Sequence, residues 1–169
     1  GCTSGGDNVA LGHEALENVT TGSYNIAVGH SAMGSSSTGV SYNTAVGHRA
    51  LRDSEANYNT GIGYLALTVT TSGSQNTAVG NAAGQSITTG DHNAIIGSFA
   101  GDSITTGVAN ILFGTNAGTA ITTGNYNVGL GVNSLDANTT ASNNTAIGYS
   151  ALSDNTTGTN NTAVGIYAG

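Results

Sequence analysis

The chain has 169 residues, of which 7% are charged, and its formal net charge is −7 at pH 7. Arg49 and Arg52 are its only strong bases. This shortage argues against nucleic acid and against an anionic membrane surface, because proteins bind both mainly through lysine and arginine. No apolar run approaches the ~20 residues of a membrane-spanning helix, so we expect no membrane insertion. The chain begins without methionine, and we expect a processed product or a segment of a longer protein.

One asparagine recurs along the whole chain and defines a repeat. It occurs ten times at spacings of 17, 18, 16 and then 17 residues six times, each time followed four residues later by glycine. The positions are Asn8, Asn25, Asn43, Asn59, Asn76, Asn93, Asn110, Asn127, Asn144 and Asn161. A fixed period of this length is typical of a repeat array. We therefore predict a single domain over residues 1–169, made of ten coils.

We number the asparagine of each coil as position 0. Each coil contains one predicted strand directly after this asparagine. Position 3 is always large and apolar, and position 1 is mostly β-branched. Both side chains project from the same face of a strand. We expect Val79 and its counterparts at position 3 to line the interior. One short strand per coil is therefore predicted just after the asparagine.

The second half of each coil shows a compensating change of side-chain volume. Position 7 is alanine in nine copies, and position 8 is leucine or methionine in some coils and glycine in others. Where position 8 is glycine in a complete coil, position 11 becomes isoleucine, as in Gly84 and Ile87. A packed interior requires such compensation, so positions 8 and 11 are predicted to share one interior. We expect a second short extended segment here, closed by a glycine of positive φ such as Gly90.

These patterns predict an all-β fold, a parallel β-solenoid with ten coils of about 17 residues. Coils stacked at ~4.8 Å give a rod about 48 Å long. The asparagine column is predicted to form a structural ladder in which side-chain amides bond neighbouring coils. Tolerance of a left-handed turn conformation is the alternative explanation for the asparagine.

Association between chains is also expected. The small residues at positions 2 and 7 would let chains approach closely, and we predict a homo-oligomer, specifically a trimer. The array begins and breaks off at almost the same phase of the repeat, and open solenoid ends are strand edges that invite pairing. Head-to-tail stacking into a filament follows as a hypothesis.

The segment 158–168, Gly-Thr-Asn-Asn-Thr-Ala-Val-Gly-Ile-Tyr-Ala, resembles the head repeat of YadA-like trimeric autotransporter adhesins. That repeat has the form Asn-Ser-Val-Ala-Ile-Gly-x-x-Ser, and the likeness covers essentially all ten copies, although the unit here is longer. Similar repeats occur in phage and viral tail fibres. The resemblance implies a left-handed parallel β-roll, with three chains side by side in an extracellular adhesive fibre at the cell surface.

Two aromatic columns are candidate ligand surfaces. His13, His30 and His48 share position 5, one coil apart. Tyr24, Tyr42, Tyr58 and Tyr126 share the position before the asparagine. The histidines could ligate a metal, but neighbouring carboxylates form no repeating set, so we expect a solvated column with no metal and no cofactor. The tyrosines could stack on sugar rings of a glycan, and the alternative is cross-coil packing that stiffens the rod.

No recurring set of nucleophile, base and acid stands out, and we expect no enzyme. The leading functional hypothesis is a structural extracellular fibre or filament whose task is adhesion to a glycan or host-surface ligand. A phage or viral tail-fibre shaft is the first alternative. An ice-binding solenoid is the second, suggested by the repeated threonine pairs such as Thr88 and Thr89.

Overall fold

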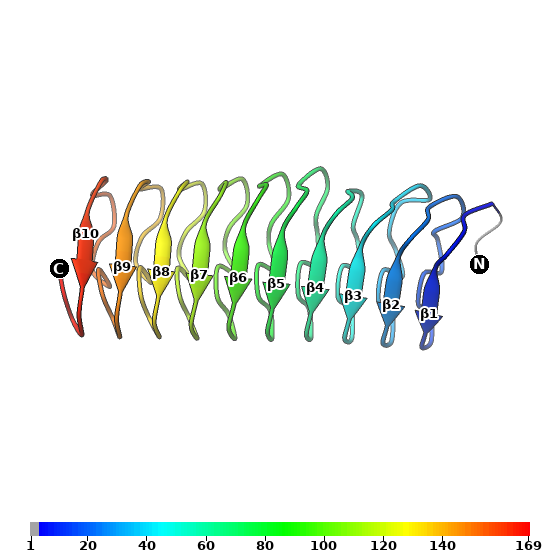
Figure 1. Cartoon of the computed structure of the whole chain (residues 1–169), viewed down its shortest axis with the longest axis horizontal. Helices are drawn as coiled ribbons and strands as arrows, with labels where there is room; N and C mark the ends of the chain where they lie inside the picture. The colour runs from blue at the N-terminus through cyan, green and yellow to red at the C-terminus, as the bar shows by residue number, and fades with distance from the viewer. Residues whose placement is uncertain (1–3) are drawn as a thin grey trace.

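The computed structural model describes residues 4–169, and Cys2, the one cysteine of the sequence, lies outside this range. The described chain forms ten strands of three residues and no helix, so it contains no helix able to cross a membrane. The strands are β1 (Val9–Leu11), β2 (Ile26–Val28), β3 (Thr44–Val46), β4 (Thr60–Ile62), β5 (Thr77–Val79), β6 (Ala94–Ile96), β7 (Ile111–Phe113), β8 (Val128–Leu130), β9 (Thr145–Ile147) and β10 (Thr162–Val164). They lie side by side along one axis in sequence order, as Figure 1 shows. The predicted parallel β-solenoid is confirmed.

Neighbouring strands pair in parallel and in the same register throughout, as in Thr77 with Ala94 and Val79 with Ile96. The one long coil and the one short coil do not disturb this register, since Ile26 pairs with Thr44 and Thr44 with Thr60. The extra residue is therefore absorbed outside the sheet. In Figure 1 the strands descend on the near side while the chain advances from right to left, which is the left-handed sense of winding.

The strands turn position 2 to the interior, and not position 3. Ile95 and Leu112 are fully buried, whereas Ile96 and Phe113 beside them are 42% and 40% exposed. The expectation that Val79 and its counterparts line the interior is therefore wrong. The cause is the narrowness of the coil: a Cβ at Gly61, in position 2, would already meet the carbonyl oxygen of Ala66 at 3.1 Å.

Positions 2 and 7 consequently lie inside the coil, where Ala78 and Ala83 are fully buried. Small residues at these positions let the two walls of one coil approach each other. They do not let two chains approach, so this part of the reasoning for association is wrong.

The predicted volume compensation is present in the core. A Cβ at Gly84 would meet Ile87 Cδ1 at 3.1 Å, Ile95 Cδ1 at 3.2 Å and Leu67 Cδ2 at 3.2 Å. These three large side chains are fully buried and belong to one continuous hydrophobic cluster. Positions 8 and 11 therefore share one interior, as predicted, and residues of position 2 fill it from the other wall.

The turns differ from the prediction in two ways. Gly90 is not in the positive-φ region; it is glycine because a Cβ there would collide with the carbonyl oxygen of Gly107 on the next coil. Positive φ falls on the residue before each asparagine, such as His92 at 61°. The second half of the coil is a run of turns and not an extended segment, with positive φ at positions 6 and 8, as at Leu65 and Leu67.

Candidate functional site

The asparagine column lies at the inner start of each strand and links every coil to the next. Asn93 is 1% exposed, and its Oδ1 accepts the backbone N–H of Asn110 at 2.9 Å. Its Nδ2 donates to the carbonyl oxygen of Gly107 at 2.8 Å and to Oδ1 of Asn76 at 3.0 Å. The same pattern recurs from Asn8 to Asn161, as a hydrogen-bonded ladder. None of the ten ladder asparagines has positive φ.

The tyrosine column lies on the surface of the early coils. The rings of Tyr24 and Tyr42 are stacked with centroids 5.0 Å apart, and those of Tyr42 and Tyr58 likewise at 5.0 Å. All three side chains are about half exposed. Tyr126 belongs to the same position but has Ala109 and Asn143 as its column neighbours, and it is 60% exposed. The column is thus one stack of three rings and one isolated ring.

A shallow depression opens beside the last ring of this stack. Its volume is about 350 Å³, and Tyr58 lines it together with Glu55, Asn57 and the hydroxyl residues Thr71, Ser72 and Ser74. The next coil has Gln75 at the tyrosine position, so no further aromatic ring continues the stack. An aromatic face beside acid, amide and hydroxyl groups is the chemistry that suits a sugar ring.

The histidine column lies at the corner that follows each strand. Ring centroids are 5.1 Å apart for His13 and His30 and 5.2 Å apart for His30 and His48. Tyr64 continues the stack at 5.3 Å from His48. The backbone fixes this spacing, because Ser31 N donates to the carbonyl oxygen of His13 at 2.8 Å. Nδ1 of His48 is buried and has no hydrogen-bond partner.

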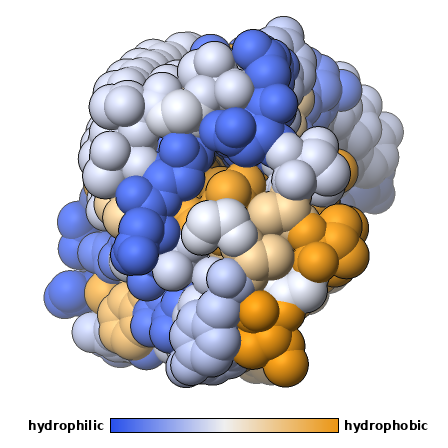
Figure 2. All heavy atoms as spheres, turned by 90° about the vertical axis from the view of Figure 1, so that its left-hand side faces the viewer, coloured by the Kyte–Doolittle hydropathy of each residue, from blue (hydrophilic) through white to orange (hydrophobic). Residues whose placement is uncertain are grey.

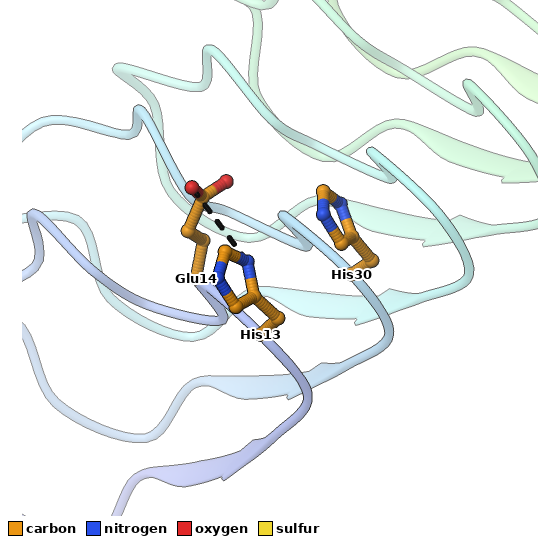
Figure 3. A group of neighbouring side chains, drawn as sticks. All are labelled: His13, Glu14 and His30. Atoms are coloured by element: carbon orange, nitrogen blue, oxygen red, sulfur yellow. Dashed lines mark ion pairs between the residues drawn. The ribbon is translucent and has the colours of Figure 1, made fainter.

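One carboxylate joins the first two histidines. Oε1 of Glu14 lies 3.6 Å from Nδ1 of His13, and Figure 3 marks this ion pair with a dashed line. Its Oε2 accepts the hydroxyl of buried Ser31 at 2.7 Å, and the same hydroxyl lies 2.9 Å from Nδ1 of His30. One ligand atom from each of His13, Glu14 and His30 lies within 4.8 Å of the others. Within residues 4–169 this is the one such group of three.

Electrostatics keep this carboxylate ionised. The hydrogen bond from Ser31 is the main cause that lowers the pKa of Glu14; burial opposes it, and the nearby charges of His13, His30 and Arg49 each lower the pKa by a smaller amount. A depression of about 170 Å³ adjoins the cluster and is lined by charged residues of both signs, among them Glu17 and Arg52. The cluster is therefore a fixed anion between two imidazoles, open to solvent.

The outward face of the sheet is the second large surface feature. We call the outward side chains of positions 1 and 3 the outer sheet face. Five threonines share this face with its apolar members. Its apolar members are Val9, Leu11, Ile26, Val28, Val46, Ile62, Val79, Ala94, Ile96, Ile111, Phe113, Val128, Leu130, Ile147 and Val164. All of them are partly or largely exposed, so the rod carries a continuous apolar stripe over ten strands.

Two of these features were missed in the sequence. The search for a repeating set of carboxylates overlooked the cluster of Glu14 and Ser31, in which a single acid lies beside the first two stacked rings. The inward placement of position 2 did leave a signal: Ile95 and Leu112, its only large members, occur in coils whose position 8 is glycine.

The fold and these surfaces define a class, a parallel β-solenoid repeat protein. Comparison with protein-family models, curated protein sequences and solved structures gives no significant match. The resemblance to YadA-like head repeats consequently rests on the repeat motif and on the solenoid fold.

Proposed function

We propose that this chain is a structural β-solenoid of an extracellular fibre, which associates laterally with copies of itself and serves adhesion. The observation that carries the proposal is the outer sheet face. Ile96, Ile111 and Phe113 are each about 40% exposed on neighbouring strands. Monomeric proteins seldom leave a continuous apolar patch of more than a few hundred Å² in water, and larger patches mark interaction surfaces.

The size of the outer sheet face sets the area that a lateral assembly can bury. Ten strands spaced by ~4.8 Å and three residues wide give a flat area of about 480 Å². Three such faces packed around one axis bury about 1,400 Å² in total, which is about 480 Å² for each of the three pairwise contacts, so the assembly depends on all three contacts together. The homotrimer implied by the resemblance is therefore our proposed assembly, with the three apolar stripes at its centre.

The C-terminal end of the rod supports longitudinal contacts as well. Figure 2 shows this end, where apolar side chains lie without cover across the section of the coil. Val164, Ile166 and Tyr167 are 68%, 72% and 69% exposed, and β10 pairs only with β9. We extend the proposal to a longer stack, in which β10 pairs with a further coil, either of the same chain or of a second copy stacked head to tail.

Sedimentation equilibrium at micromolar concentration tests the lateral assembly. We expect a trimer for the unchanged chain and a monomer for Ile96→Lys, because the ammonium group would be placed in the apolar interface. Thr106→Lys is the matched control, since Thr106 is exposed and lies outside the outer sheet face, and it should remain trimeric. A monomeric unchanged chain would refute the assembly.

The adhesive part of the proposal assigns a glycan to the depression beside Tyr58. The free face of this ring would stack on a sugar, and the surrounding hydroxyl, amide and carboxylate groups would bond its hydroxyls. A glycan array read with the unchanged chain, Tyr58→Ala and Tyr126→Ala tests it. We expect binding that Tyr58→Ala abolishes and Tyr126→Ala retains; an array without any positive spot would remove glycan adhesion from the proposal.

A shaft of a phage or viral tail fibre would use the same rod and the same apolar stripe, and it remains the alternative within the proposal. Images of the native particle distinguish a virion spike from a cell-surface fibre. Ice binding receives less support. The hydroxyls of Thr88, Thr105 and Thr122 donate to carbonyl oxygens of the next coil, so the first threonine of each of these pairs has a structural partner.

A further inference from the structure

We propose that His13, Glu14 and His30 form a binding site for a zinc-type divalent cation at the N-terminal corner of the solenoid. Two imidazole nitrogens and one carboxylate oxygen are a donor set that zinc accepts, with a fourth position left for water. The inference is independent of lateral assembly and of glycan binding, because it concerns a different corner of the coil.

The backbone holds the three donors close to the geometry that a cation requires. The corners that carry His13 and His30 are tied by the hydrogen bonds from Gly29 N to Leu11 O and from Ser31 N to His13 O, both 2.8 Å. Metal–nitrogen bonds of about 2.1 Å place donors about 3.4 Å apart in a tetrahedral site. The donor atoms here lie within 4.8 Å of one another, so side-chain rotations alone close the remaining distance.

The side chains are free to make these rotations. The side chains of His13 and Glu14 are 71% and 43% exposed, and His30 is also exposed. The rings of His13 and His30 are nearly parallel, 17° apart, so both must tilt for their lone pairs to converge on one ion. Tilting His30 also loosens its stack on His48. These adjustments oppose binding, and we therefore expect affinity in the micromolar range.

Ser31 acts as a positioning residue. Its hydroxyl is buried and holds Oε2 of Glu14 at 2.7 Å, which leaves Oε1 to face His13. Hydrogen bonds of this kind orient metal ligands, and their loss commonly costs about 10–100-fold in affinity. The net charge of −7 favours a cation, whereas the neighbouring Arg49 opposes it.

Isothermal titration with Zn²⁺ at pH 7.5 tests the site. The background is Cys2→Ser, because a thiolate is itself a zinc ligand. We expect one Zn²⁺ per chain, with affinity lowered at least tenfold by His13→Ala, by Glu14→Gln and by His30→Ala. His92→Ala is the matched control, since His92 is an exposed histidine of a different column, and its affinity should equal that of the background. Mg²⁺ should give no heat, because hard cations prefer oxygen ligands.

A spectroscopic readout separates loss of the site from loss of the fold. In ¹H–¹⁵N spectra of the imidazoles, Zn²⁺ should shift the ring nitrogens of His13 and His30 and leave those of His92 in place. Ser31→Ala should weaken binding without changing which rings respond. The proposal is overturned if the background chain shows no saturable Zn²⁺ binding. It is equally overturned if His92→Ala weakens binding as much as His13→Ala does.

Discussion

Replacement of Asn93 by alanine tests the ladder at its centre. The substitution removes the oxygen that accepts the N–H of Asn110 at 2.9 Å and the amide that donates to Gly107 O at 2.8 Å. Asn110 and Gly107 are both buried, so water does not replace the lost partners. Each buried polar group left unsatisfied costs about 1–3 kcal/mol, and the two together predict a loss of about 2–6 kcal/mol.

Asn161→Ala is the matched control from the last coil. Its amide donates to Oδ1 of Asn144 at 3.1 Å, but that oxygen still accepts the backbone N–H of residue 161 at 3.0 Å. The side chain is only half-buried. We expect a loss of less than about 1 kcal/mol, the usual net contribution of one hydrogen bond.

Urea denaturation followed by circular dichroism measures both changes. Hydrogen exchange at the amide of Asn110 is the local readout, because a repeat array does not always unfold in one step. Protection of this amide should fall in Asn93→Ala and not in Asn161→Ala. Equal losses in the two variants, together with unchanged protection at Asn110, would refute the reasoning.

Three further predictions follow, two on the interior and one on the half-buried Asp102. Thr70→Val should stabilise the fold by about 1 kcal/mol in urea denaturation, because Oγ1 of Thr70 is buried without a hydrogen-bond partner. Thr68→Val is the control: it removes the 2.7 Å hydrogen bond from Oγ1 of Thr68 to the carbonyl oxygen of Leu65, and it should destabilise the fold. Gly84→Leu should cost about 1–3 kcal/mol through overpacking, and adding Ile87→Val, which copies the coil of Leu16 and Val19, should recover part of this loss. Additive losses would contradict a shared interior. Burial raises the pKa of Asp102, so the folded state is penalised once the carboxyl ionises. The penalty is absent at low pH, where the carboxyl is protonated in both states, and grows as pH rises through the raised pKa. Asp102→Asn should therefore raise the melting temperature at pH 7 and leave it unchanged at pH 3, and an increase at both pH values would contradict this cause.

The repeat made the fold class predictable, because each coil repeats the same local choices. One strand per coil and the parallel pairing follow from a period that returns to its phase after one long and one short coil. The repeat did not show which face of each strand is turned to the interior. Alternation shows that positions 1 and 3 share a face, and it does not show which face is inside.

The conformations of the turns could not be predicted from the repeat pattern either. Glycine at position 90 suggested positive φ, yet its role is to let the carbonyl of Gly107 approach from the next coil. Tyr42 and Leu67 take positive φ although their side chains disfavour it. Hydrogen bonds between stacked coils impose these conformations, and contacts of this kind have no counterpart in local sequence preference.

The placement of large residues outside and small ones inside has one physical cause, and it bears on function. A coil with leucine at position 8 has room only for alanine or glycine at position 2, so the β-branched residues that suit a strand stand on the outer face. The free energy of covering them is then available to a partner that is as long and as flat as the sheet. A second copy of this chain is as long and as flat as the sheet, because it has the same sheet. A rounded partner would cover only a few strands. For this reason the response of the proposed assembly to Ile96→Lys tests the architecture of the coil as well as its surface.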